Sequence, residues 1–265
     1  MLDLMARTWF NVTFNGTVPS ARFAHDAAVL PESRSMLVFG GRVPTGQLGN
    51  GCSNGALAAV DASYSDETWL LRPSSEMGDR SWEPVPRQLP WPPGRAGHTL
   101  ASTSEGLLMF GGVSPRAGLT TSPTNRGSAP LGGRQGSHQQ LLMALNDTWV
   151  FAADEERWER VNASQGHAPE PRHSHSSVNM LMPSGPDAAS RNTLVESVVI
   201  FGGTDNCEVP VISGSHFYND LWVYTVATAT WYKVPPPSGT PPTPRFSHSS
   251  AVTGSNTLMI YGGAF

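Results

Sequence analysis

A chain of 265 residues is long enough to bury a substantial core, either as one all-β domain or as two smaller domains. Only 14% of its residues are charged, whereas 27 are glycine and 23 are proline, a balance that favours turns and short strands over long helices. The net charge of −4 provides no basic excess for binding phosphate, so no nucleic-acid partner is expected. The sequence contains no apolar stretch near the roughly 20 residues that a membrane span needs.

Four short patterns recur in a fixed order along the chain. A tryptophan is followed by Arg-x-x-His, then by an apolar run that ends in an aromatic residue and two glycines, and then by an acidic residue two positions before a second tryptophan. The four cycles contain, in turn, Trp9, Arg22, His25, Gly40, Gly41, Glu67 and Trp69; Trp82, Arg95, His98, Gly111, Gly112, Asp147 and Trp149; Trp158, Arg172, His175, Gly202, Gly203, Asp220 and Trp222; and Trp231, Arg245, His248, Gly262 and Gly263.

This regular order identifies an internal repeat. Each cycle predicts four short strands: one starts near Arg-x-x-His, the second ends at Gly-Gly, the third starts near the acidic residue, and the fourth holds the lone tryptophan. A four-stranded sheet has two faces to cover, and packing successive sheets face to face around a central axis covers both. The sequence therefore predicts a β-propeller.

The order of strand-Gly-Gly, Asn-Asp-x-Trp, Trp and Arg-x-x-His resembles the kelch repeat over essentially the whole chain. The resemblance implies an all-β fold, a partial kelch-type β-propeller with three complete four-stranded blades and two half-blades. We expect one segment over 1–265: a partial blade at 1–14, blades at 20–86, 95–162 and 172–235, and a partial blade at 245–265. Kelch propellers usually have more blades, so we expect a fragment; the alternative is that the half-blades join to close a small ring.

The Arg-x-x-His pairs are the first candidates for chemistry, as general bases or metal ligands. Their recurrence in every unit favours a structural hydrogen bond in each blade instead. Asp147 and Asp220 are expected to accept backbone N–H groups in turns, and Glu67 to alter one such turn without changing the fold. No common catalytic motif is present, and no copper-binding set of Tyr, His and Cys is evident, so neither an enzymatic activity nor a metal or cofactor is expected.

The connections from second to third strands, at about 42–65, 113–145 and 204–218, are predicted to lie on one face with the proline-rich links between blades. Loops on a rigid scaffold commonly carry function. We therefore predict a non-enzymatic protein-interaction scaffold that presents these loops to a protein partner. The alternative is the propeller portion of a larger carbohydrate-active or copper oxidase-like enzyme with catalytic residues outside this chain. The residues expected to contact the partner are Arg42, Arg116, Arg134, Asp205 and Asn206.

Three further expectations concern the loops and the environment. The stretch 114–140 is rich in Ser, Gly, Pro and Thr, a composition that favours disorder. Cys52 and Cys207 are too few for a disulfide framework but leave a single bridge open. A cytoplasmic location is slightly favoured, although glycosylation sequons leave an extracellular one open; they begin at Asn11, Asn15, Asn146 and Asn162.

Overall fold

In the computed structural model of the protein, strands make up nearly all of the regular secondary structure. It describes residues 2–3, 7–9, 12, 14, 16–45, 62–73, 80–121, 139–162, 168–187, 192–205, 216–235 and 238–264. Within these ranges the helical structure is a single 3-10 turn, η2, at Val226–Thr228, and a further 3-10 residue at Asn192. The strands are β1 (Leu2–Asp3), β2 (Thr8–Trp9), β3 (Asp26–Val29), β4 (Met36–Phe39), β5 (Arg42–Pro44), β6 (Ala62–Tyr64), β7 (Thr68–Leu71), β8 (Trp82–Pro84), β9 (Thr99–Thr103), β10 (Gly106–Phe110), β11 (Val113–Thr121), β12 (Gln139–Ala144), β13 (Thr148–Ala152), β14 (Arg157–Val161), β15 (Ser176–Pro183), β16 (Leu194–Phe201), β17 (Leu221–Thr225), β18 (Thr230–Lys233), β19 (Ser249–Val252) and β20 (Leu258–Tyr261).

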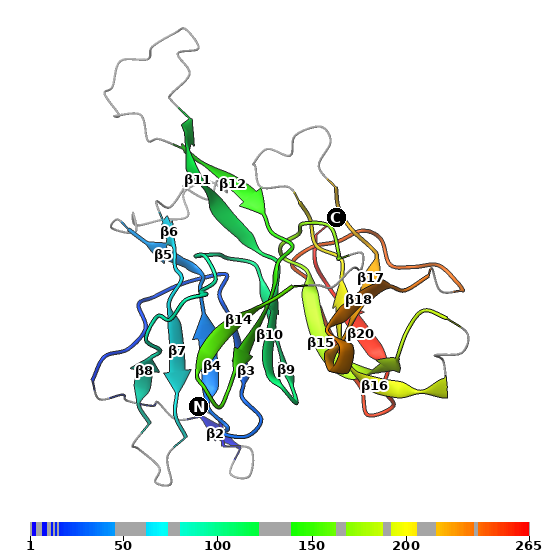
Figure 1. Ribbon diagram of the computed structural model, residues 1–265, viewed down its shortest axis with the longest axis horizontal. Helices are drawn as coiled ribbons and strands as arrows, with labels where there is room; N and C mark the ends of the chain where they lie inside the picture. The colour runs from blue at the N-terminus through cyan, green and yellow to red at the C-terminus, as the bar shows by residue number, and fades with distance from the viewer. Residues whose placement is uncertain are drawn as a thin grey trace, which may run out of the picture.

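Three four-stranded antiparallel sheets form the body of the molecule (Figure 1). Their strand orders are β3-β4-β7-β8, β9-β10-β13-β14 and β15-β16-β17-β18, and we call them the first, second and third blades. The pairs β1-β2 and β19-β20 form two-stranded sheets that we call the N-terminal and C-terminal half-blades. The register repeats, because the aromatic residue before each glycine pair lies opposite the first residue of the third strand: Phe39↔Thr68, Phe110↔Thr148 and Phe201↔Leu221.

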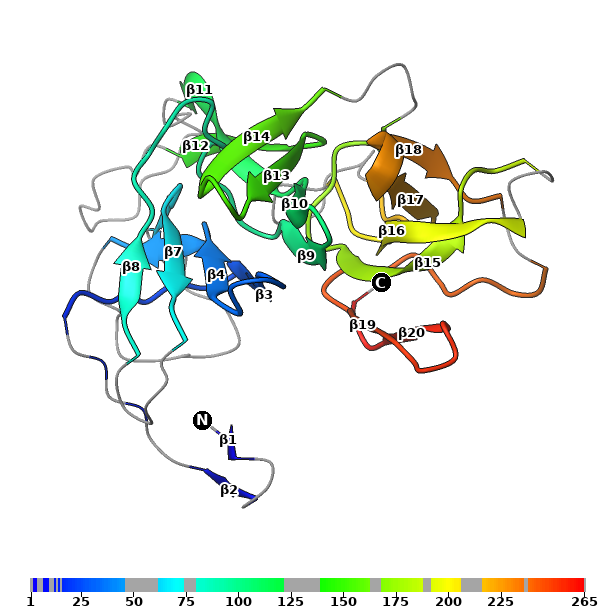
Figure 2. The same cartoon turned by 60° about the horizontal axis from the view of Figure 1, so that its bottom comes forward.

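The blades surround a common centre, toward which their first strands β3, β9, β15 and β19 face (Figure 2). Contacts join β3 to β9, β9 to β15 and β15 to β19, so each sheet follows its neighbour around the hub. The sheets do not close into a ring. The expected all-β, partial kelch-type propeller with three complete blades and two half-blades is therefore confirmed.

The apolar core lies between the blades rather than within one sheet. One cluster joins the first and second blades, where the buried Trp158 ring sits 5.1 Å from Phe39 and 5.2 Å from Phe151. A second cluster joins the second and third blades, where Trp231 packs 4.9 Å from Phe110. Hydrogen bonds reinforce both contacts, because the Trp158 and Trp231 indoles donate to hydroxyls of the preceding blade, Thr68 at 2.9 Å and Thr148 at 3.0 Å.

The glycine pairs allow neighbouring blades to approach closely. Gly111 has a φ of +64°, and a Cβ there would lie 2.6 Å from the carbonyl oxygen of Arg172 in the next blade. The next glycine, Gly112, donates its backbone N–H to that same carbonyl at 2.9 Å. Because only glycine accepts both the positive φ and the contact, the glycine pairs of the three complete blades help to fix the distance between neighbouring blades.

Every blade has two distinct ends. The connections from second to third strand and from blade to blade lie at one end, which we call the loop end; the turns within each hairpin lie at the other, which we call the turn end. At the loop end β5 pairs with β6 and β11 with β12, and both hairpins extend beyond the blades (Figure 1). The expectation of disorder over 114–140 is thus wrong for the residues in β11 and β12; residues 122–138 lie outside the described part.

Candidate functional site

Each complete blade carries an ion pair at the loop end, and this pair is buried in the second and third blades. The Arg95 guanidinium donates to both carboxylate oxygens of Asp147 at 2.7 Å and to the Gly111 carbonyl at 2.9 Å. The Asp147 carboxylate also accepts the indole N–H of Trp149 at 2.7 Å. The third blade repeats this with Arg172, Asp220, Gly202 and Trp222, and the first with Arg22, Glu67, Gly40 and Trp69.

These contacts differ from the turn bonds expected for the acidic residues. The carboxylate partners are an arginine and a tryptophan rather than turn amides, and Glu67 reaches the same partners as the aspartates of the other blades. Burial alone raises the pKa of Asp147, but the hydrogen bonds and charge of Arg95 outweigh burial and leave that pKa below its ordinary value. A carboxylate held ionised in this way contributes to the fold rather than to proton transfer. The fourth arginine, Arg245, donates to the Gly262 carbonyl at 2.8 Å.

The histidines of the repeat lie nearer the hub, and two of them, His175 and His248, connect successive blades. The His175 Nε2 atom lies 2.9 Å from the hydroxyl of Thr99, and the His248 Nε2 atom lies 2.8 Å from the hydroxyl of Ser176. Burial lowers the pKa of His175 well below its ordinary value, and the charge of Arg172 lowers it further. A neutral imidazole bonded to a hydroxyl in a neighbouring blade matches the geometry of a structural hydrogen bond.

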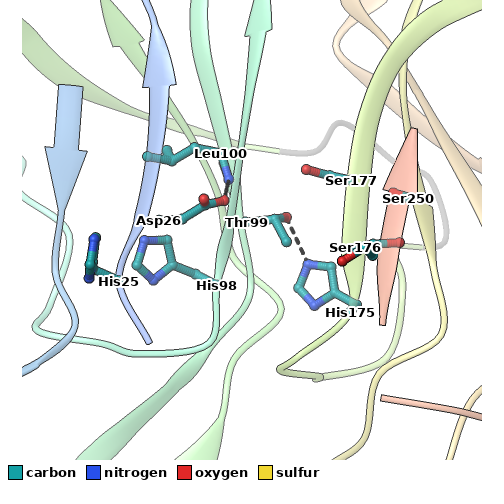
Figure 3. Close-up of a pocket in the computed structure, with 10 residues that line it drawn as sticks. His25, Asp26, His98, Thr99, Leu100, His175, Ser176, Ser177 and Ser250 are labelled. Atoms are coloured by element: carbon teal, nitrogen blue, oxygen red, sulfur yellow. Dashed lines mark hydrogen bonds between the residues drawn. The ribbon is translucent and has the colours of Figure 1, made fainter. Parts of the chain in front are cut away.

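A cavity of about 350 Å³ lies at the hub, at the loop end of the first strands. Figure 3 shows His25, Asp26 and His98 on one side of it, with Thr99, His175 and three serines on the other. Its lining is mostly polar. The lining residues are His25, Asp26, His98, Thr99, Leu100, His175, Ser176, Ser177, Ser249 and Ser250.

Asp26 is a residue of this cavity that sequence reasoning overlooked. It occupies the repeat position after the histidine, where the other units have Thr99, Ser176 and Ser249. Its two carboxylate oxygens accept the backbone N–H groups of Ala27 at 2.8 Å and of Leu100 at 2.6 Å. Aligning the four units at this position was the available signal, since one acidic residue interrupts a series of hydroxyls.

Arg42 lies at the loop end in an aromatic setting. Its guanidinium carbon sits 5.1 Å from the centre of the Phe23 ring and 5.5 Å from that of Tyr64. Backbone bonds between Arg42 and Phe23, at 2.8 and 3.1 Å, hold this arrangement in place. In the part of the chain that the structure describes, no carboxylate forms an ion pair with Arg42.

The other predicted contact residues are separated around the loop end. Arg116 is exposed on β11. Asp205 follows the third glycine pair, and its carboxylate lies 2.9 Å from the Nδ1 atom of His216. Arg134 and Asn206 lie outside the described residues, as do Cys52 and Cys207.

An aromatic group at the third blade was also overlooked. The Phe217 ring stacks on Phe246 with centroids 5.5 Å apart, and the Tyr218 ring lies 4.0 Å from the Arg172 guanidinium. Together with Phe23 and Tyr64, these rings give the loop end several flat apolar surfaces beside charged groups.

Metal ligands and membrane-spanning helices can both be assessed in the described residues. No three His, Cys, Asp or Glu side chains among them are grouped so as to hold a metal ion. Nor does any helix in those ranges have the length and apolar character to cross a membrane.

Each complete blade contains an arginine–carboxylate pair, a glycine pair joins it to the next blade, and the blades are arranged around a hub. These features define the class of protein as a kelch-type β-propeller. Residues 1–263 match the family described as the KLHDC2/KLHL20/DRC7 Kelch-repeats domain, and the chain belongs to the kelch-repeat family.

Among curated proteins the chain is similar to host cell factors. It is 25% identical over 261 residues to host cell factor of Drosophila melanogaster, covering 98% of this chain and 14% of that protein. It is also 25% identical over 259 residues to host cell factor 1 of Homo sapiens, covering 96% of this chain and 10% of that protein. The chain therefore spans only a small part of the length of these relatives.

Proposed function

We propose that this chain is a non-enzymatic scaffold that binds a protein partner through the loop end of its propeller. The observation that carries the proposal is the setting of Arg42, whose guanidinium is held against two aromatic rings at that end. A guanidinium positioned by ring contacts loses little side-chain entropy on binding, and aromatic residues and arginine are the types enriched at protein interfaces.

The chemistry of Arg42 favours a carboxylate on the partner. A guanidinium presents paired N–H donors that match the two oxygens of a carboxylate, and the neighbouring rings can contact the apolar part of the same segment. Arg42 is half-buried, and Arg116 on β11 adds an exposed cation at the same end. Membership in the kelch family supports a binding role, although fold alone does not determine function.

The test is selection of peptides from a displayed library on the purified 265-residue chain, followed by measurement of affinity by fluorescence anisotropy. We expect the selected peptides to contain an acidic residue and to bind Arg42→Ala at least about tenfold more weakly, the loss typical of a truncated interface hot spot.

The matched control is Arg157→Ala, at the turn end, where Arg157 pairs with Glu155 and Glu159. This variant should bind the selected peptides as the wild type does. Equal affinity of Arg42→Ala and wild type, or loss of binding in the control alone, would refute a partner site at the loop end.

A further inference from the structure

The hub contains one contact between blades that departs from the repeat. Between the second and third blades, and between the third blade and the C-terminal half-blade, a hydroxyl bonds the next histidine: Thr99 with His175, and Ser176 with His248. Between the first and second blades the hydroxyl position holds Asp26, and the histidine is His98. The Asp26 carboxylate bonds the backbone of Ala27 and Leu100 instead.

His98 is left in an unusual state by this exchange. Its side chain lines the cavity beside Asp26 (Figure 3) and the residue is only 4% exposed, yet neither ring nitrogen has a hydrogen-bond partner. In His175 and His248 the Nε2 atom is bonded and only Nδ1 is without a partner. A buried polar group without a partner costs free energy, so an unpaired imidazole in the wall of a polar cavity indicates a ligand position.

The charges around the cavity determine which ligand fits. Asp26 forms no ion pair among the described residues, whereas the nearby Arg22 and Arg95 are already paired with Glu67 and Asp147. The imidazoles add no positive charge, because burial lowers the pKa of His98 to about 3 and, aided by Arg22, lowers that of His25. The remaining lining groups are mostly hydroxyls, which accept hydrogen bonds as well as donate them.

We propose that the Asp26–His98 side of the hub cavity binds an alkylammonium group. An ammonium has three donors and no acceptor, so it can donate to the Asp26 carboxylate, to an unpaired His98 nitrogen and to a serine hydroxyl. It also supplies a positive charge to the Asp26 carboxylate, which has only backbone N–H partners. The group can belong to a lysine side chain of a partner or to a free small amine. The proposal concerns the hub and does not depend on Arg42.

The competing interpretation is that Asp26 only joins two blades through the Leu100 backbone. That role needs an acceptor and no net charge, whereas binding of an ammonium needs the carboxylate. The repeat itself supplies the variant that separates these roles: Asp26→Ser installs a hydroxyl residue, as in the other units, opposite His98.

The experiment titrates the 15N-histidine-labelled chain with n-butylammonium chloride at constant ionic strength, and follows the His98 ring nitrogens by NMR. We expect a saturable shift of these resonances that neither sodium chloride nor sodium butyrate produces. We expect Asp26→Ser to weaken binding at least about tenfold, the loss typical of removing a charged hydrogen-bond partner. The control is Glu32→Gln, which removes the charge of an exposed carboxylate in the turn between β3 and β4. This variant should leave binding unchanged.

A second arm distinguishes the source of the ammonium. Stronger binding of Nα-acetyl-lysine N-methylamide than of 1,4-diaminobutane supports a partner lysine, and the reverse order supports a free amine. An absence of any saturable His98 shift in the wild type would overturn the site even if Asp26→Ser failed to fold. An undiminished affinity in a folded Asp26→Ser protein would overturn it as well. Neither result would bear on the peptide selection with Arg42→Ala.

Discussion

Residues at the same repeat position experience very different surroundings. Trp158 in the second blade is fully buried, with an exposed fraction of 0%, because the first blade covers it. Trp9 in the N-terminal half-blade holds the corresponding position and is 78% exposed. Residue type alone therefore does not tell how much a tryptophan contributes; the presence of a neighbouring sheet does.

This contrast leads to a prediction on stability. Trp158→Ala removes a buried ring and the hydrogen bond to Thr68, so we expect the free energy of unfolding to fall by about 3–5 kcal/mol. Trp9→Ala is the matched control and should change it by less than about 0.5 kcal/mol. Urea unfolding followed by circular dichroism measures both values. Similar losses in the two variants would contradict the proposed packing between blades.

The buried histidines make stability depend on pH. The pKa of His98 lies at about 3 because burial, and then the charge of Arg95, disfavour its protonated form. The unfolded chain protonates this imidazole near its ordinary value of 6.5. Between these two values the unfolded state binds more protons, so the free energy of unfolding decreases as the pH falls, by at most about 1.4 kcal/mol per pH unit for this residue.

The measurement is urea unfolding at several values between about pH 7 and pH 5, the upper part of that window. We expect His98→Gln to lower the slope of stability against pH compared with the wild type, because one group that protonates only on unfolding is gone. Glu32→Gln is the control, since this side chain is exposed in the turn between β3 and β4. Identical slopes for wild type and His98→Gln would show that His98 takes up no extra proton on unfolding in this pH range, and would contradict the lowered pKa.

At the scale of the element, each glycine pair ends a second strand and places it against the next blade. A Cβ at Gly40, Gly111 or Gly202 would lie 2.7, 2.6 or 2.7 Å from an arginine carbonyl of the neighbouring sheet. At Gly262, in the C-terminal half-blade, a Cβ would have nothing within 4 Å. The first glycine of each pair thus has a left-handed backbone, and in the three complete blades it also makes a close contact with the next sheet. These two requirements can be separated.

Alanine substitutions separate these requirements. Gly262→Ala, at a φ of +73°, should cost about 1–2 kcal/mol from the left-handed backbone alone. Gly111→Ala adds a clash with the Arg172 backbone and should cost more than about 4 kcal/mol, a loss that is exceptional for one substitution. Chemical denaturation of the two variants tests this order. A smaller loss for Gly111→Ala than for Gly262→Ala would contradict it.

The hairpins at the loop end show what an element gains from its position. β11 and β12 pair across a segment whose composition alone favours disorder, because the second blade supplies two adjacent strand ends from which the ladder continues. Composition describes a segment in isolation, whereas the sheet of the blade holds the two ends of that segment next to each other.

At the scale of the whole molecule, the arc of blades leaves apolar sheet surface uncovered. Tyr261 in β20 is 82% exposed, whereas Phe39, Phe110 and Phe201 at the same repeat position are buried. Met259 in the same strand is also exposed. An exposed apolar face beside an unpaired strand edge favours association between chains.

We therefore expect the 265-residue chain to self-associate as its concentration rises. The double variant Met259→Lys and Tyr261→Ser should reduce this association, because it places charge and polarity on the uncovered face. Analytical ultracentrifugation over a range of concentrations measures the effect, and substitution of the buried Phe110 is unsuitable as a control because it disrupts the core. A chain that stays monomeric at high concentration would refute the expectation.

The sequence by itself determined the number of strands in each blade, their order and the residues that end them. These features are local. A glycine pair, an acidic residue before a strand or a tryptophan in a strand indicates the same structure in each repeat, so each repeat supports the prediction made from the others. Only the tertiary structure showed that Glu67 substitutes for aspartate in an ion pair, that Trp9 and Trp158 differ in burial, and that Asp26 leaves His98 without a partner. Each of these depends on how a side chain meets groups distant in the sequence, and the distance between such groups is set by packing around the hub.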